Sequence, residues 1–268
     1  MHNVLVTIPS ARGVHPQTLS CVFDLRTELE KRGHRLHLGH VYRMPLDLAR
    51  NELVTAFLST ACDLNLWLDD DCQIEPAHVE YLFDAIEGGC DIVSAPCRMR
   101  GENNLFNIVP IGEVSSMGRA RVVECAWTGF GAVMVRRAVW EKMHAGAVER
   151  DKMRNRSEPE CYLSTLMPPR ISAGFFKSMV VPARRFDLGA PEDMNIYLLD
   201  DRAFSARAHD AGFKIHAAID VATAHDGMRG CFAEELERFD RARAVEHTRA
   251  RIKALVDING KPIDRGAL

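Results

Sequence analysis

Short apolar runs alternate with amphipathic segments through the first hundred residues of the chain. The apolar runs, which predict strands, cover residues 4–8, 35–39, 64–68 and 91–95. The segments between them place apolar residues at helical spacing, and the predicted helices cover residues 17–31, 49–60 and 76–88. This β-α-β-α-β-α-β order is typical of an α/β fold built on a parallel sheet.

The pattern in the second half is less regular. Strands are predicted at 122–125 and 132–135, on either side of the sequence WTGFG, and at 214–217 and 221–224. Helices are predicted at 137–143, 196–211 and 232–256, a hairpin at 173–176 and 179–181, and a charged loop that closes over a ligand at 149–159. No linker divides the chain, so one domain is expected, with a nucleotide-binding half (1–100), an acceptor and catalytic half (101–230) and a C-terminal helix and tail (231–268).

Composition narrows the class of protein. The chain has 268 residues, 47% of them hydrophobic, which is enough for a large core, and its net charge of −3 provides no general attraction for nucleic acid or a membrane surface. The eight cysteines include no CxxC pair, so we expect reduced core residues in a cytoplasmic protein without a structural zinc site. The N-terminal MHNVLVTIPS is predicted to be a strand rather than a signal peptide, and no apolar run reaches transmembrane length.

The strongest chemical signal is the sequence LNLWLDDDC at residues 64–72. A buried strand ends here in three consecutive carboxylates, Asp69, Asp70 and Asp71. Ligands of open α/β sheets bind beyond the carboxyl ends of the strands, and adjacent acids repel one another unless a cation or hydrogen-bond donors compensate their charge. In an extended chain Asp69 and Asp71 point the same way, which suits one carboxylate on a divalent cation and the other on a ligand hydroxyl. A solvated acidic loop is the alternative.

Three segments, taken in order, resemble nucleotide-sugar glycosyltransferases with the GT-A fold, especially small proteins like glycosyltransferase family 2, including bacteriophage ones. The first segment, LWLDDDC, is similar to a strand-terminal DxD motif. The second, TGFGAVMVRRAVWEKM, is similar to the glycine-bearing strand and helix that form the floor of the acceptor site. The third covers residues 198–227, where Asp201, Arg207, Gly212 and His225 follow the family's intervals.

The resemblance implies a mixed α/β sheet with helices on both faces. It implies transfer of a sugar from a nucleotide diphosphate, a UDP-sugar by default, to a hydroxyl of a saccharide, a protein or DNA. Mn²⁺ or Mg²⁺ on Asp71 and His225 would bridge the diphosphate. The expected donor-binding residues are Thr7, Pro9, Ser10, Arg50, Asn51, Asp69 and Asp70, and the expected acceptor site is Trp127, Gly129, Phe130 and Gly131.

The resemblance also places a general base at the acidic pair Asp200 and Asp201, where family members usually carry Glu in the first position. A hydroxyl that attacks an anomeric carbon needs such a base within hydrogen-bond reach. Asp201 is the expected base, and Asp200, its neighbour on a helix, is expected to point about 100° away. The alternative is a pair of acids that simply favours the helix macrodipole.

Simpler or different interpretations remain open for these residues. Arg50 and Asn51 also suit helix capping and a surface charge, His225 an ordinary strand end, and the glycines of TGFG either a close backbone approach or a bulge.

Other functions are possible too. A DNA glycosyltransferase acting on hydroxymethylated bases would use the arginines at 136–137, 150–156 and 184–185 as a phosphate-binding rim. A nucleotidyltransferase would need a glycine-rich triphosphate loop, for which SARGVHP is poor, and a non-catalytic sugar-nucleotide binder would not need Asp71 and Asp201. GxGxxG and GxxxxGK are absent, which argues against dinucleotide-binding and P-loop proteins.

Overall fold

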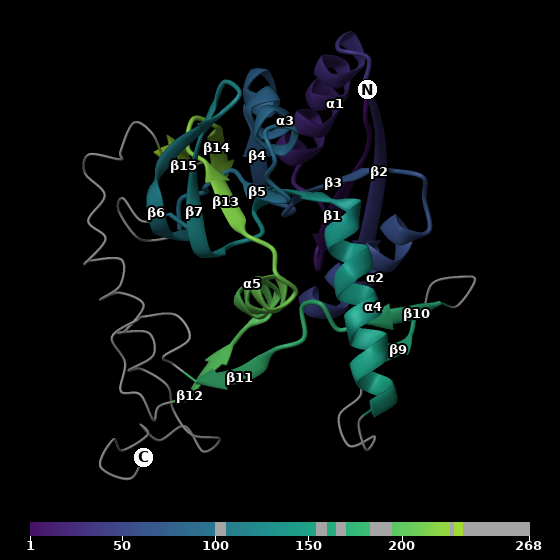
Figure 1. The fold of residues 1–268 in the computed structure, drawn as a ribbon. Coiled ribbons are helices and arrows are strands. Elements are labelled where there is room, and N and C mark those ends of the chain that lie inside the picture. The colour runs from purple at the N-terminus through teal and green to yellow at the C-terminus, as the bar shows by residue number, and fades with distance from the viewer. Residues whose placement is uncertain (100–105, 154–159, 165–169, 183–194, 226–227, 233–268) are drawn as a thin grey trace, which may run out of the picture.

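A central sheet of eight strands organises the chain (Figure 1). The structure is a computed structural model that describes residues 1–99, 106–153, 160–164, 170–182, 195–225 and 228–232. The strands lie in the order β2-β1-β3-β8-β5-β13-β7-β6. Their bounds are β1 (Asn3–Ser10), β2 (Arg35–Tyr42), β3 (Leu64–Leu68), β5 (Ile92–Ser94), β6 (Ile108–Met117), β7 (Ala120–Thr128), β8 (Ala132–Arg136) and β13 (Ile215–Ala218).

The sheet is mixed rather than wholly parallel. β1 pairs in parallel with both β2 and β3, as the alternating pattern of the first half predicts. The next strand of that half, β5, does not lie beside β3, because β8 is inserted between them and runs antiparallel to both. β13 then pairs in parallel with β5 and antiparallel with β7.

Helices cover both faces of the sheet (Figure 1). Their bounds are α1 (Pro16–Lys31), α2 (Leu46–Leu58), the short 3₁₀ turn η1 (Pro76–His78), α3 (Val79–Glu87), α4 (Arg137–Met153) and α5 (Asp200–Asp210). One core packs α1 and α3 against the sheet, and the other packs α2, α4 and α5 against the opposite face. β3 shows why, since Leu64, Leu66 and Leu68 enter the first core and Trp67 enters the second. The predicted single α/β domain with a mixed sheet and helices on both faces is confirmed.

Three small sheets complete the described structure. A three-stranded antiparallel sheet has the order β15-β14-β4, and two hairpin-like pairs join β9 to β10 and β11 to β12. Their bounds are β4 (Cys72–Ile74), β9 (Cys161–Leu163), β10 (Ile171–Ala173), β11 (Met179–Pro182), β12 (Asn195–Leu198), β14 (Ala222–His225) and β15 (Met228–Cys231). None of the described helices is both long and apolar enough to cross a bilayer.

Several predicted boundaries in the second half are wrong. The helix predicted at 137–143 continues to Met153, into the predicted loop at 149–159, because Val139, Trp140, Met143 and Ala147 keep one apolar face on the core. The rest of that loop, 154–159, and nearly all of the helix predicted at 232–256 lie outside the described residues.

The predicted hairpin at 173–176 and 179–181 is also wrong. β10 pairs with β9 instead, and β11 pairs with β12. Residues 196–198, predicted as helical, therefore belong to a strand. The helix begins only after Leu199, whose extended backbone (φ −75°, ψ 175°) marks the boundary.

Candidate active site

The acidic triplet forms a turn between β3 and β4. The Cys72 N–H donates to the Asp69 carbonyl at 3.0 Å, so the chain is not extended here as the sequence analysis assumed. The Asp69 N–H donates to the carbonyl of Gly131 at 3.1 Å, and the carbonyl of Asp70 accepts from the His15 N–H at 2.9 Å. The turn is thus fixed by backbone bonds on both sides, and the side chains of Asp69 and Asp71 have different partners.

Arg50 of α2 joins Asp69 to the acidic pair at the start of α5. Its Nη2 donates to Asp69 Oδ1 at 2.9 Å, and its Nη1 donates to Asp200 Oδ2 at 2.8 Å and to Asp201 Oδ1. The Arg50 side chain is 1% exposed, whereas the three carboxylates are 24–28% exposed. One buried positive charge therefore holds together three partly exposed negative charges from segments far apart in the sequence.

Both members of the acidic pair face Arg50. The expectation that Asp200 would point about 100° away from Asp201 is therefore wrong. The two residues begin α5, and both reach the same nitrogen of the guanidinium. A role for Asp201 must accordingly be tested against Asp200 as a close partner.

Two aromatic rings pack against the guanidinium of Arg50. The Arg50 Cζ atom lies 5.4 Å from the centre of the Phe130 ring and 5.5 Å from that of Phe176. Phe176 in turn stacks on Phe204 of α5, with ring centres 5.3 Å apart. The rings of Phe130 and Phe176, called the aromatic floor below, restrict the side chain of Arg50. Core residues thus support the arginine that contacts the three carboxylates.

The polar residues that follow Arg50 on α2 are buried and anchor neighbouring segments. Asn51 Oδ1 accepts from the N–H of Phe176 at 3.1 Å, which holds the ring beneath Arg50. The hydroxyl of Thr55 donates to that of Ser172 on β10 at 2.7 Å. The structure thus gives Asn51, predicted as a donor-binding residue, an internal contact that positions the aromatic floor.

The TGFG turn after β7 contacts both halves of the site. The N–H of Phe130 donates to Asp201 Oδ2 at 3.2 Å, and the carbonyl of Gly131 accepts from Asp69. A Cβ at Gly129 would lie 2.5 Å from the side-chain nitrogen Nδ2 of Asn107, so no larger residue fits there without movement. The close approach that Gly129 permits is therefore that of the Asn107 side chain.

The environment shifts the acidity of two of these carboxyls. Burial, and after it the nearby carboxylates of Asp200 and Asp69, raise the pKa of Asp201 to about 7 against the opposite effect of Arg50 and the Phe130 N–H. Burial likewise raises the pKa of Asp69 against the effect of Arg50. A carboxyl that titrates near neutrality suits proton transfer, which general acid–base catalysis requires.

Asp71 and His225 form a second cluster beside the turn. His225 Nε2 lies 3.4 Å from Asp71 Oδ1, and His225 Nδ1 lies 2.9 Å from the carbonyl of Arg98. The hydrogen bond to Asp71 raises the pKa of His225 to about 9. The thiol of Cys72 belongs to the same cluster, because one ligand atom from each of the three residues lies within 4.8 Å of the others. The two predicted metal ligands are therefore adjacent.

Two of the predicted donor-binding residues at the end of the first strand have hydroxyls that are hydrogen-bonded within the protein. β1 continues to Ser10, so Thr7, Pro9 and Ser10 belong to the strand rather than to a loop. The buried hydroxyl of Thr7 accepts from Asn65 at 3.0 Å, and that of Ser10 accepts from the N–H of Gly13 at 2.7 Å. These hydroxyls have internal partners, so a nucleobase would meet this strand end through its backbone or by displacing them.

The predicted acceptor residue Trp127 lies at the end of β7, next to Thr128. It is nearly buried, and the guanidinium of Arg202 on α5 lies over its ring, with Cζ 4.4 Å from the ring centre. Arg202 follows Asp201 directly in the chain. The contact therefore places Trp127 beside the residue that directly follows the acidic pair.

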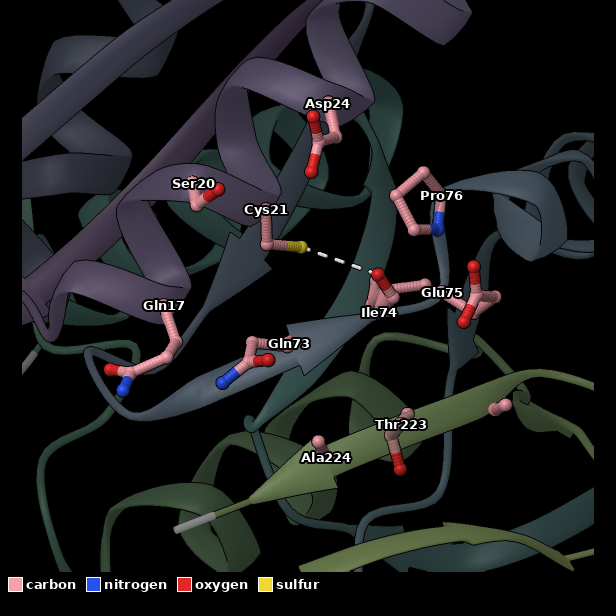
Figure 2. Close-up of a pocket in the computed structure, with 11 residues that line it drawn as sticks. Gln17, Ser20, Cys21, Asp24, Gln73, Ile74, Glu75, Pro76, Thr223 and Ala224 are labelled. Carbon is pink, nitrogen blue, oxygen red and sulfur yellow. Dashed lines mark hydrogen bonds between the residues drawn. The ribbon is translucent and has the colours of Figure 1, made fainter. Parts of the chain in front are cut away.

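A polar groove of about 330 Å³ lies between α1 and the β4–β14 ladder (Figure 2). Its polar lining side chains are Gln17, Ser20, Asp24, Gln73, Glu75 and Thr223. The Cys21 thiol donates to the carbonyl of Ile74 at 3.3 Å, which fastens β4 to α1 (Figure 2). Because strand residues alternate, Gln73 points away from the face that carries Cys72 and His225. Ile74 and Thr223, which leave the same face as Cys72 and His225, also line the groove, but no residue of the two acidic clusters does.

The arginines predicted to form a phosphate-binding rim have internal partners where the structure describes them. Arg136 donates to the carbonyls of Cys90 and Ile86. Arg137 donates to carbonyls at the end of α2 and in the turn that follows, which satisfies groups that a helix C-terminus leaves unpaired. Arg150 pairs with Glu160, and residues 154, 156, 184 and 185 lie outside the described residues.

No protein-family model and no curated protein matches the chain. Among solved structures it is similar to a protein from STIV, at 13% identity over 83% of this chain and 85% of that one (TM-score 0.47). It is also similar to a glycosyltransferase involved in the glycosylation of the major capsid of PBCV-1 (12% identity, 88% and 100% covered, TM-score 0.32). A UDP-glucose pyrophosphorylase complexed with UDP-glucose is a further match (10% identity, 92% and 99% covered, TM-score 0.41).

Two contributors to the site were missed in the sequence. Phe176 was assigned to a hairpin, and its place under Arg50 depends on the bond to Asn51, which no local pattern reveals. Cys72 was grouped with the core cysteines, although it directly follows the acidic triplet. Its position next to Asp71 was the available signal.

Proposed function

We propose that the protein transfers a sugar from a nucleotide diphosphate to a hydroxyl, with Asp201 as the general base and inversion at the anomeric carbon. One observation supports this most directly: Arg50 joins Asp69 of the acidic turn to Asp201 at the start of α5. A carboxyl that titrates near neutrality is thereby held beside a strand-end acidic turn. The resemblance to GT-A glycosyltransferases implies the same pairing, and UDP is the default nucleotide by that resemblance alone.

The proposed reaction gives each side chain a task. Ionised Asp201 accepts the proton of the acceptor hydroxyl while the hydroxyl oxygen bonds to the anomeric carbon. The bond between that carbon and the diphosphate oxygen breaks, and the electron pair leaves with the diphosphate. Arg50 and the Phe130 N–H hold the two oxygens of Asp201, so the carboxylate does not have to be ordered at the moment of reaction.

Asp71 and His225 are the proposed ligands of a divalent cation. A carboxylate oxygen and an imidazole nitrogen 3.4 Å apart are a donor set that fits a transition metal such as Mn²⁺. Such an ion, when bound, stabilises the negative charge of the departing diphosphate. Asp69, at the other end of the turn, is the proposed contact for the ribose and sugar.

Binding of UDP is expected to depend on a metal and on Asp71. Calorimetry should show tighter binding with Mn²⁺ than with a chelator, and Asp71→Ala should abolish the difference because the cation loses a charged ligand. Asp24→Ala, which removes the same charge from α1, is the control and should keep the metal effect. Equal affinity of the unaltered protein with Mn²⁺ and with chelator would contradict the proposal, and a Mn²⁺-dependent hydrolysis screen of nucleotide sugars would then identify any other donor.

The rate of transfer is expected to rise with pH, to be half-maximal near pH 7 and to level off above about pH 8. Asp201 must be ionised to act as a base, and the pKa of about 7 sets the midpoint, which belongs to the coupled carboxylates as a group. Asp200→Asn removes a negative charge that raises the pKa of Asp201, so the rising limb should move to lower pH. The measurement is kcat against pH for both proteins. A limb that stays in place or moves to higher pH would show that another group is titrating.

A further inference from the structure

The thiol of Cys72 lies in the same cluster as the two proposed metal ligands. The Asp71 Oδ1 atom is 3.4 Å from His225 Nε2 and 3.8 Å from Cys72 Sγ. At zinc bond lengths, the ligand atoms of a tetrahedron are separated by about 3.3 Å for oxygen and nitrogen and about 3.6 Å for oxygen and sulfur. Neighbouring oxygens around octahedral Mg²⁺ are closer, at about 3.0 Å. The two observed separations are within about 0.2 Å of the tetrahedral values.

The backbone directs both side chains to one place. Cys72 on β4 and His225 on β14 are direct partners in the antiparallel ladder, so their side chains leave the same face. The Nδ1–H of His225 donates to the carbonyl of Arg98 at 2.9 Å, which turns the lone pair of Nε2 toward the cluster. This outer hydrogen bond is the usual support of a metal-binding histidine.

Gly131 packs against the sulfur of Cys72. A Cβ on Gly131 would lie 3.0 Å from Cys72 Sγ and equally close to Cys97 Sγ, so the turn packs directly against both thiols. Cys97 donates its own thiol hydrogen to the carbonyl of Ala95 at 3.5 Å. Three side chains with ligand atoms thus converge, and a tetrahedral ion held by them would have a fourth position for an oxygen of a bound molecule, as in zinc sites with an open coordination position.

We propose that Cys72 is a third ligand at this site and that the site selects a borderline transition metal of the Zn²⁺ and Co²⁺ class over Mg²⁺. Thiolate is a soft ligand that Mg²⁺ does not take, whereas Zn²⁺ and Co²⁺ accept sulfur, nitrogen and oxygen together. On binding, the Cys72 thiol loses its proton to solvent and its sulfur donates to the metal. The inference deepens the proposed function by naming its metal, and it rests on that function only for the role of the ion.

Absorption spectroscopy of the Co²⁺-loaded protein tests the ligand directly. A thiolate-to-Co²⁺ charge-transfer band should appear in the near-ultraviolet with one equivalent of Co²⁺ and should disappear on addition of Zn²⁺ but not of excess Mg²⁺. Cys72→Ser should lack the band and bind Zn²⁺ more weakly by at least about 10–100-fold, the loss that even an outer-shell mutation causes. Cys161→Ser, which removes a half-buried thiol elsewhere, is the matched control and should keep the band.

X-ray absorption of the Zn²⁺-loaded, unaltered protein keeps the test independent of whether Cys72→Ser folds. A sulfur at about 2.3 Å from the metal is expected. A spectrum fitted by nitrogen and oxygen alone, or a Co²⁺ band that survives in folded Cys72→Ser, overturns the proposal. A sulfur ligand without turnover of any nucleotide sugar supports the metal site and rejects the proposed function. Turnover without a sulfur ligand supports the proposed function and rejects Cys72 as a metal ligand.

Discussion

Asp201→Asn is expected to lower the rate of sugar transfer by about 10²–10⁴-fold, the usual contribution of a positioned general base. The amide has the same size, and its oxygen still accepts from Arg50 or from the Phe130 N–H, so the packing of the turn is kept. Affinity for the donor should change little, because Asp201 acts on the acceptor. Single-turnover kinetics with a saturating donor, together with calorimetric donor binding, separates these two effects.

Asp200→Asn is the matched control for this substitution. Asp200 also contacts Arg50, so its loss should alter the pH profile but leave most of the rate at pH 8, where Asp201 is ionised. If Asp200→Asn abolishes transfer and Asp201→Asn is active, the base is Asp200. If both variants transfer at the rate of the unaltered protein, neither acid is the base, and a retaining mechanism becomes the better interpretation.

Arg50→Met is expected to destabilise the fold by less than the about 3–5 kcal/mol that follows removal of one partner from a fully buried ion pair, because the three carboxylates left behind are 24–28% exposed. Met has a similar length and keeps the contact with Phe130 and Phe176, so the loss reports the charge rather than a cavity. Three carboxylates would be left without their common cation. Urea denaturation at pH 8, compared with the unaltered protein, gives the difference in the free energy of unfolding.

The electrostatic origin of this loss has two checks. The deficit should shrink as the pH falls from 8 toward 5, because carboxyls whose folded-state pKa is raised above the unfolded value near 4 become protonated, and their mutual repulsion ends. Asp200→Asn and Asp201→Asn together should partly restore Arg50→Met. Arg121→Met breaks an exposed pair with Asp220 and should cost less than about 1 kcal/mol. A deficit that is constant over this pH range would point to lost packing.

The elements of the first half could be predicted because their signals are local. An apolar run of five residues and a helical repeat of apolar positions each lie within one element, and β1, α1, β2, α2 and β3 were found in this way. Pairing partners carry no such signal. The insertion of β8 beside β3 and the pairing of β11 with β12 depend on segments that are distant in the chain, so the parallel sheet and the hairpin were predicted where the structure has other neighbours.

The candidate site also combines residues that have a local sequence signal with residues that have none. Its acids were chosen because each stands at the end of a strand or the start of a helix, which the sequence shows directly. The partnership between Arg50 and Asp201 spans 151 residues, and no spacing rule reports it. Cys72 belongs to no CxxC pair, the spacing that indicates cysteine ligands in a sequence. Its neighbours in the cluster are the preceding residue and a strand residue more than 150 positions later.

The place of β8 between β3 and β5 has a consequence for the order in which a nascent chain can fold. Until residues 132–136 leave the ribosome, β3 and β5 have no strand to join them, and their free edges expose unpaired N–H and C=O groups that invite pairing with other chains. The sheet is then extended by β13, which arrives some eighty residues later, so its closure depends on contacts of long sequence separation and should be slow. Because residues 200–201 emerge in the same interval, an early fragment has only Asp69 to pair with Arg50, and the guanidinium gains its other two carboxylates only as the sheet is completed.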